Sequence, residues 1–145
     1  MGKLKTEISL QLGVRSLLYN SDYLMSILWV AIGGALGSSL RLLINQQFAF
    51  PYGTMLVNIF GSFVMGVAFV TLSSRTPSDT SLFVMTGLLG GFTTFSAFSL
   101  DSFKLWQEGH ILFTILYIIS SVVFSILVLV FGMMFARTTL IWMIK

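Results

Sequence analysis

The chain has 145 residues, of which 56% are hydrophobic and 9% are charged, whereas about a quarter of the residues of a soluble domain are charged. This composition excludes a soluble domain and indicates an integral membrane protein. Eight Lys and Arg against five Asp and Glu give a net charge of +3, and because the basic residues lie mostly at helix ends and chain termini, they are typical of interfacial anchors and exclude a nucleic-acid surface.

Residues 1–23 precede the first long apolar run. Leu4, Ile8 and Leu12 follow one helical line, which indicates a short amphipathic segment at the membrane interface. The segment lacks the compact apolar core of a cleaved signal peptide, so we expect the first span to target the chain. Residues 20–22 are Asn, Ser and Asp, which are N-cap types, and they predict that the first span begins after them.

The first predicted span covers residues 24–44, about the twenty residues needed to cross the hydrocarbon core. Gly33 and Gly37 form a small-xxx-small pair, which favours close packing against another helix. Arg41 lies near the far end of the span, where its guanidinium must reach the interface or pair within the protein.

The second predicted span covers residues 54–72 and carries Asn58, Gly61, Ser62 and Gly66 along one side. Buried amides in membrane helices often join neighbouring helices, and Asn58 would also offer an NH2 donor to a passing ion. The sequence leaves both roles open.

The third predicted span covers residues 82–103 and holds a glycine pair and several hydroxyls within an apolar run. We expect the helix to break near Gly90-Gly91. Backbone groups freed inside a membrane must find partners in the protein or line a wet cavity, so a break there predicts a site.

The fourth predicted span covers residues 111–136. Its residues Tyr117, Ser121 and Ser125 are spaced at i, i+4 and i+8, which places three hydroxyls on one helix face. Such hydroxyls often only bond back to a carbonyl four residues earlier, and this alternative competes with a polar lining.

Several kinds of chemistry are excluded. The sequence has no Cys and one His, His110, which excludes disulfides, thiolate metal sites and haem or iron–sulfur ligation. No span carries a His, Asp or Glu pair at ligand spacing, so we expect neither an enzyme nor proton-coupled export.

The spans instead offer uncharged hydrogen-bond donors and the electropositive edges of two rings, which suit an anion. A Phe pair alone would more often be packing, but the surrounding hydroxyls and the broken backbone favour a pathway. The residues are Asn58, Thr93, Thr94, Phe95, Ser96, Phe98, Tyr117, Ser121 and Ser125.

Four helices of this length enclose little volume, and the glycine-rich faces favour association, so we expect a homodimer. Freed carbonyls of Gly90-Gly91 and Thr93 from both copies would form a ring of hard oxygen ligands suited to a buried sodium ion.

The distribution of charge also bears on orientation. After residue 23, one side of the membrane has three Lys and Arg and the other has two, a difference that fixes orientation poorly and predicts that both orientations coexist. Lys3, Lys5 and Arg15 would bias the N-terminus inward.

Three stretches carry a resemblance to a known family. Residues 33–41 are GGALGSSLR, residues 53–58 are GTMLVN and residues 87–99 are GLLGGFTTFSAFS. Together they resemble the CrcB/Fluc family of fluoride channels, and the resemblance covers about residues 27–136. Phe92 and Ala97 depart mildly from the family pattern, and the first 23 residues have no clear counterpart.

The resemblance implies an antiparallel, dual-topology dimer with two fluoride pores and a central structural sodium ion. It implies that backbone carbonyls of Gly90 and Thr93 hold the sodium and that Arg41 lies near the pore vestibule. Residues that line the fluoride path would be Asn58, Phe95, Phe98, Tyr117 and Ser121, with Ser125 a further contributor.

We therefore expect an all-α membrane protein whose residues 24–145 form a four-helix fluoride channel domain. It would let fluoride leave the cytoplasm passively through the cell membrane and so reduce its toxicity. The alternative is a dual-topology four-helix exporter of small molecules or cations, but that class needs a membrane-embedded glutamate and the first three spans have none.

Overall fold

The computed structural model describes the backbone of residues 2–73 and 78–144 and the side chains of residues 22–73 and 78–143. These residues form helices and no strand. The elements are α1 (Gly2–Gln47), α2 (Tyr52–Leu72), α3 (Asp79–Ser81), the π-helix η1 (Leu82–Leu89), α4 (Gly90–Phe92), α5 (Phe95–Gln107) and α6 (Ile111–Ile144).

Four stretches of the described residues are long and apolar enough to cross a membrane, which confirms the four predicted spans. They are Asp22–Gln47, Tyr52–Leu72, Asp79–Gln107 and Ile111–Met143. An even number of spans places the N-terminus and the C-terminus on the same side of the membrane.

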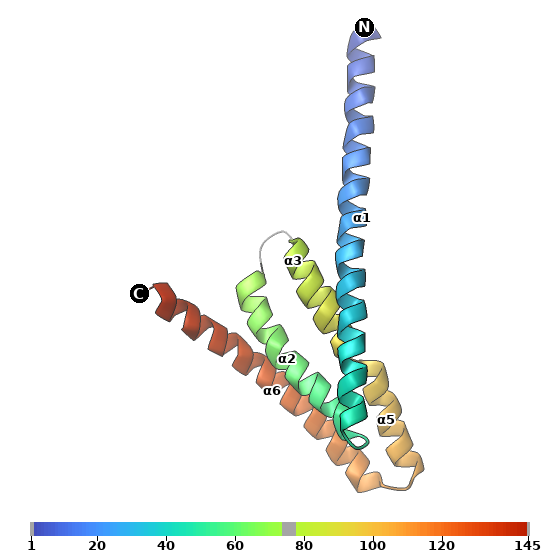
Figure 1. Cartoon of the computed structure of the whole chain (residues 1–145), viewed down its shortest axis with the longest axis vertical. Coiled ribbons are helices and arrows are strands. Elements are labelled where there is room, and N and C mark those ends of the chain that lie inside the picture. Colours follow the sequence, from blue (N-terminus) through green and yellow to red (C-terminus); the bar gives the residue numbers. More distant parts are fainter. Residues whose placement is uncertain (1, 74–77, 145) are drawn as a thin grey trace.

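Helix α1 is longer than one span requires. Its 46 residues correspond to about 69 Å at the rise of an α-helix, against about 30 Å of hydrocarbon. Figure 1 shows its N-terminal half, in blue, standing beyond the other helices. The N-cap predicted at residues 20–22 is not observed, because the helix runs through them without a break. A polar residue caps a helix only where the chain before it leaves the helix, and here it does not.

Glycines bring α1 close to the first part of the third span. A Cβ added to Gly91 would lie 2.6 Å from the carbonyl oxygen of Gly34, and one added to Gly37 would collide with the carbonyl of Leu88. The small-xxx-small prediction for α1 is therefore confirmed, since the backbones touch where these side chains are missing.

Helices α2 and α6 run side by side along most of α2, as Figure 1 shows in green and orange. Glycines again set the distance, because Gly66 lies against the backbone of Leu129 and Gly132 lies against the carbonyl of Phe63. The pair forms one wall of the molecule, and α1 with η1 forms another.

The third span breaks later than predicted. Gly90 has φ −64° and ψ −37°, which is helical, and Gly91 lies within α4. The backbone becomes extended only at Thr93, with ψ 154°, and at Thr94, with φ −153° and ψ 119°. The break thus lies near Gly90-Gly91 but about one turn later, because Gly91 packs closely on α1 while the β-branched threonines take the extended conformation.

Candidate functional site

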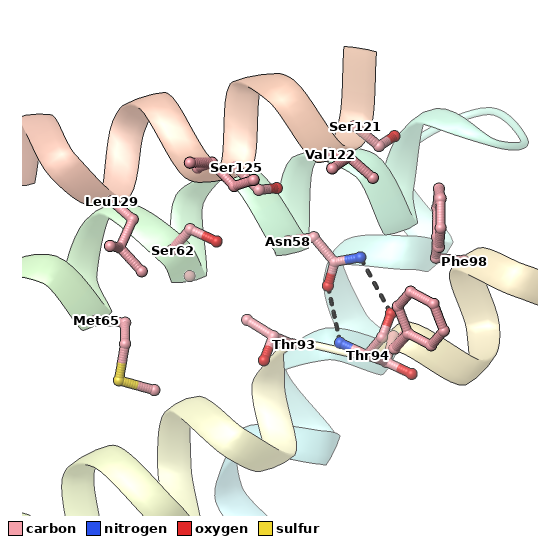
Figure 2. Close-up of a pocket in the computed structure, with 13 residues that line it drawn as sticks. Asn58, Ser62, Met65, Thr93, Thr94, Phe98, Ser121, Val122, Ser125 and Leu129 are labelled. Atoms are coloured by element: carbon pink, nitrogen blue, oxygen red, sulfur yellow. Dashed lines mark hydrogen bonds between the residues drawn. The ribbon is translucent and has the colours of Figure 1, made fainter. Parts of the chain in front are cut away.

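The break in the third span is held open by Asn58 on α2. Its Nδ2 donates to the carbonyl oxygen of Thr94 at 3.0 Å, and its Oδ1 accepts from the backbone N–H of Thr94 at 2.8 Å (Figure 2). Of the two roles considered for Asn58, joining helices is thus confirmed. The amide has two N–H groups, and only one of them is bound to Thr94, so the second can donate to a passing ion.

The same bonds release two carbonyls. In an unbroken α-helix the N–H of residue i+4 bonds the carbonyl of residue i, so Gly90 would pair with Thr94, and Thr93 with Ala97. Instead the Thr94 N–H goes to Asn58, and the Ala97 N–H donates to the side-chain oxygen of Thr94 at 3.2 Å. The carbonyls of Gly90 and Thr93 therefore lose their ordinary helical donors, and the family resemblance implied these two as sodium ligands.

An open-sided pocket of about 350 Å³ lies between α2, α6 and the break. Figure 2 shows hydroxyls from α2 and α6 on one wall and Thr93 and Thr94 on the opposite wall. None of the lining residues is charged, and all of them belong to the described part of the chain. They are Asn58, Gly61, Ser62, Met65, Thr93, Thr94, Phe95, Phe98, Ser121, Val122, Ser125, Ile126 and Leu129.

Three aromatic rings lie in a row at one end of this pocket. The ring centroids of Phe95 and Phe98 are 5.6 Å apart, and those of Phe98 and Tyr117 are 5.5 Å apart. Phe98 in the middle is buried, but Phe95 is 77% exposed. The row therefore leads from the interior of the chain to a face that the chain itself does not cover.

Two hydroxyls on α6 are buried without a partner. The Tyr117 hydroxyl and Ser121 Oγ lie near each other, one turn apart, but neither makes a hydrogen bond of good geometry in the described structure. The neighbouring Ser120 does bond back to the carbonyl of Tyr117, at 3.3 Å, so the back-bonding alternative applies to Ser120 and fails for Ser121. Burying an unpaired hydroxyl costs about 1–3 kcal/mol, which favours a guest that accepts hydrogen bonds at this position.

Most of the predicted site residues meet here. Asn58, Thr93, Phe95, Phe98, Ser121 and Ser125 line the pocket, and Tyr117 adjoins it through Phe98. Ser96 lies beside the break, with its Oγ 3.2 Å from Thr94 Oγ1. Arg41 on α1 and Gly90 are not among the lining residues.

Met65 lines the pocket although no pattern in the sequence singled it out. It continues the face of Asn58 and Ser62 at i+7, so the helical period could have found it. Thr94 was among the predicted donors, but only the tertiary contact with Asn58 shows its structural role. Outside the pocket, Asp101 on α5 is buried as well, and no pattern in the sequence indicated it.

Comparisons with known proteins agree with one another. The family model described as "CrcB-like protein, Camphor Resistance (CrcB)" matches residues 28–133. Three curated relatives share the name "Fluoride-specific ion channel FluC". The one from Cereibacter sphaeroides is 48% identical over 118 residues, which cover 77% of this chain and 94% of the relative.

The relative from Ruegeria sp. is 45% identical over 124 residues, covering 81% of this chain and 98% of the relative. The relative from Mesorhizobium japonicum is 42% identical over 122 residues, covering 79% of this chain and 98% of the relative. The matched family region begins within the first span and so leaves out the extended start of α1.

Proposed function

The chain belongs to the CrcB family, and we propose from this membership and from the lining of its pocket that it is a fluoride-selective passive channel. It lies in the cell membrane as a multi-pass protein and lets fluoride leave the cytoplasm, which lowers the toxic load of the anion. The proposed activity is conduction, and no catalysed reaction is part of it.

The observation that carries the proposal is the pair of buried, unpartnered hydroxyls beside a pocket without charged residues. Fluoride is small and strongly hydrated, so a pore must replace its water by several close donors. The Tyr117 and Ser121 hydroxyls and the remaining N–H of Asn58 are such donors, and the ring edges of Phe95 and Phe98 are electropositive. A fixed cation in their midst would bind the anion too tightly for rapid release.

The other residues predicted for the fluoride path are assigned to it as well. Ser125 extends the hydroxyl face of α6 along the pocket, and Ser96 adds a hydroxyl beside the break. Arg41, which is partly exposed near the end of α1, attracts the anion to the entrance without entering the narrow part.

The working unit is an antiparallel homodimer with two such pathways. Two features of the single chain support this arrangement. Phe95 has 77% of its surface exposed although it lines the pocket, and the pocket is open on one side. A second copy inserted in the opposite orientation would cover both and complete the lining, as a two-fold assembly allows.

A sodium ion on the two-fold axis joins the two copies. The carbonyl oxygens of Gly90 and Thr93 would hold it, because both lose their helical donors at the break. Uncharged carbonyl oxygens are hard ligands that suit a small cation. When bound, the ion supplies a positive charge that offsets the partial negative charge of carbonyls converging from the two copies.

An exporter of cations or small molecules is the second candidate, and one observation favours it. Asp101 is a buried carboxylate within the third span, and such exporters use an embedded acidic residue. However, Asp101 is not among the residues that line the pocket, so a substrate in the pocket would not meet it.

Fluoride efflux from liposomes tests the proposal. Liposomes that contain the purified protein and potassium fluoride should release fluoride, measured with an electrode, when a potassium ionophore balances the charge. Liposomes loaded with potassium chloride instead should release chloride no faster than protein-free liposomes do. Efflux should need no pH gradient. Absence of fluoride release, or release only with a proton gradient, would contradict a passive fluoride channel and favour the exporter.

A further inference from the structure

The start of the chain adds a basic helix to the channel region. Helix α1 is unbroken from Gly2 to Gln47, but its long apolar run begins only after Asp22. Residues 2–21 thus continue the same helix outside the span, and Figure 1 shows this part projecting away from the other helices. It lies outside the region that matches the family.

The four spans assign every basic residue to one side of the membrane. Side A holds the N-terminus, the connection between α2 and α3, and the C-terminus, and side B holds the other two connections. On side A the sequence has Lys3, Lys5, Arg15, Arg75, Arg137 and Lys145, and on side B it has Arg41 and Lys104. Without residues 2–21, side A would therefore have three Lys and Arg and side B two. The extension raises the number on side A to six.

The basic residues of the extension are close enough to the first span to influence its orientation in the membrane. Arg15 is seven residues before Asp22, or about 10 Å along the helix axis. Lys3 and Lys5 precede Asp22 by 19 and 17 residues, still inside the window of about 15–20 residues in which Lys and Arg set orientation. Acidic residues such as Glu7 contribute little to this effect.

We propose that residues 2–21 are an orientation determinant that keeps side A in the cytoplasm in most copies of the chain. Lys and Arg are retained on the cytoplasmic side during insertion, so six against two favours one orientation where three against two would not. An antiparallel pair, which rests on the proposed function, needs copies in both orientations. The copies in the less frequent orientation then limit how many antiparallel dimers can assemble.

Cysteine labelling in intact cells tests the proposal, since the chain has no Cys of its own. Ser73→Cys places an exposed thiol on side A, and His110→Cys places one on side B. With a membrane-impermeant maleimide and normalisation to labelling after permeabilisation, the side-B thiol should be labelled at least about fivefold more than the side-A thiol.

Substitutions within the extension separate charge from length. With Lys3→Gln, Lys5→Gln and Arg15→Gln combined, labelling of the two thiols should come within about twofold of each other. The matched control combines Thr6→Gln, Ser9→Gln and Ser16→Gln, which change three neutral residues of the same segment and should keep the bias. Equal labelling in the unsubstituted extension, or a bias that survives the loss of its three charges, would overturn the proposal.

The labelling does not depend on conduction. A biased orientation in a protein that fails the liposome assay would contradict only the proposed function, and equal labelling in a protein that conducts fluoride would contradict only the role of the extension. If every copy has side A inside, the orientation proposal stands and the homodimer is wrong.

Discussion

Asn58 combines a structural and a chemical role in one amide. Both of its polar atoms bond to the backbone of Thr94, as a neighbouring strand would, and so they satisfy the groups that the break exposes. The second N–H on Nδ2 remains for a guest in the pocket. A substitution at this position should therefore affect folding and conduction together.

We expect Asn58→Asp to abolish fluoride efflux and to destabilise the fold. A carboxylate cannot donate to the Thr94 carbonyl, which then lies unpaired at a cost of about 1–3 kcal/mol, and its charge repels the anion. The measurements are thermal unfolding in detergent and efflux from liposomes. Ser62→Ala is the matched control one turn further along α2, and it should lower stability less. Normal efflux by a folded Asn58→Asp protein would contradict the role of Asn58.

Phe95 and Phe98 lie about one helical turn apart on α5 but differ in burial. Phe98 is 7% exposed and lies between the rings of Phe95 and Tyr117, so it contributes to the core of the single chain. Phe95 is largely exposed, and its ring is free to contribute its edge to a pathway. The two positions therefore separate a packing role from a conduction role.

Phe95→Ile should reduce fluoride efflux at least about tenfold, equivalent to ~1.4 kcal/mol, without a change in the unfolding temperature of the monomer. Phe98→Ile should reduce efflux as well and should also lower stability by about 1–3 kcal/mol, because buried ring contacts are lost. Efflux and unfolding measured on the same preparations check both. Unimpaired efflux by Phe95→Ile would return the residue to a packing or lipid-facing role.

At the scale of elements, the third span is built from four helical segments, α3, η1, α4 and α5, rather than one. The π-helix η1 and α4 lie against α1, whereas α5 starts anew after Thr94 and packs on α6. Thr94 caps the new helix, because its Oγ1 accepts from the N–H of Ala97. Gly91 fixes the approach to α1, and the threonine pair makes the break.

Substitutions of the two glycines should therefore differ. Gly91→Ala should destabilise the chain by about 1–3 kcal/mol, since its Cβ would lie 2.6 Å from the Gly34 carbonyl oxygen. Gly90→Ala should fold as well as the unsubstituted chain, because its Cβ would meet only the Met85 carbonyl oxygen, at 3.6 Å, and alanine favours a helix by about 0.5–1 kcal/mol.

Thermal unfolding and light scattering measure the two effects separately. Gly90→Ala should lower the dimer fraction although the chain is stable, because the proposed axis passes this exposed residue. An unchanged unfolding temperature in Gly91→Ala would contradict the packing on α1. An unchanged dimer fraction in Gly90→Ala would contradict the placement of Gly90 at the axis.

At the scale of the whole molecule, the single chain is an open structure. Large apolar side chains are exposed along α1 and α6, including Leu36, Leu112 and Phe131, and the pocket is open on one side. In water such surfaces would aggregate, but in a bilayer they face lipid or a second copy. The proposed dimer and its sodium ion belong to this scale.

Removing sodium should weaken the dimer. A ligand that binds only the assembled state at 100 times its dissociation constant stabilises that state by ~2.7 kcal/mol. Exchange of sodium for N-methylglucamine should therefore lower the unfolding temperature and the fraction with twice the 16.1 kDa chain mass, as measured by light scattering. Restoring sodium should reverse the loss, and potassium serves as the control cation. Identical stability in all three buffers would rule out the sodium site.

The fold class, the four spans and the chemistry of the lining could be predicted from the amino-acid sequence alone. Apolar runs of membrane length define the spans, and the period of a helix places Tyr117, Ser121 and Ser125 on one face; both are properties of a single segment. The same local rules predicted which residues suit an anion, and seven of them line one pocket.

The position of the break in the third span and the choice of free donors depend on tertiary contacts. Gly90-Gly91 was the predicted break, but Gly91 packs on α1, and the break follows from Asn58 bonding to Thr94, 36 residues away. Likewise, the helical period places Ser121 on the hydroxyl face of α6, and only packing leaves it buried and unpaired while the adjacent Ser120 bonds back to Tyr117. Contacts between distant segments decide such features, because a hydrogen bond taken by one partner is lost to another.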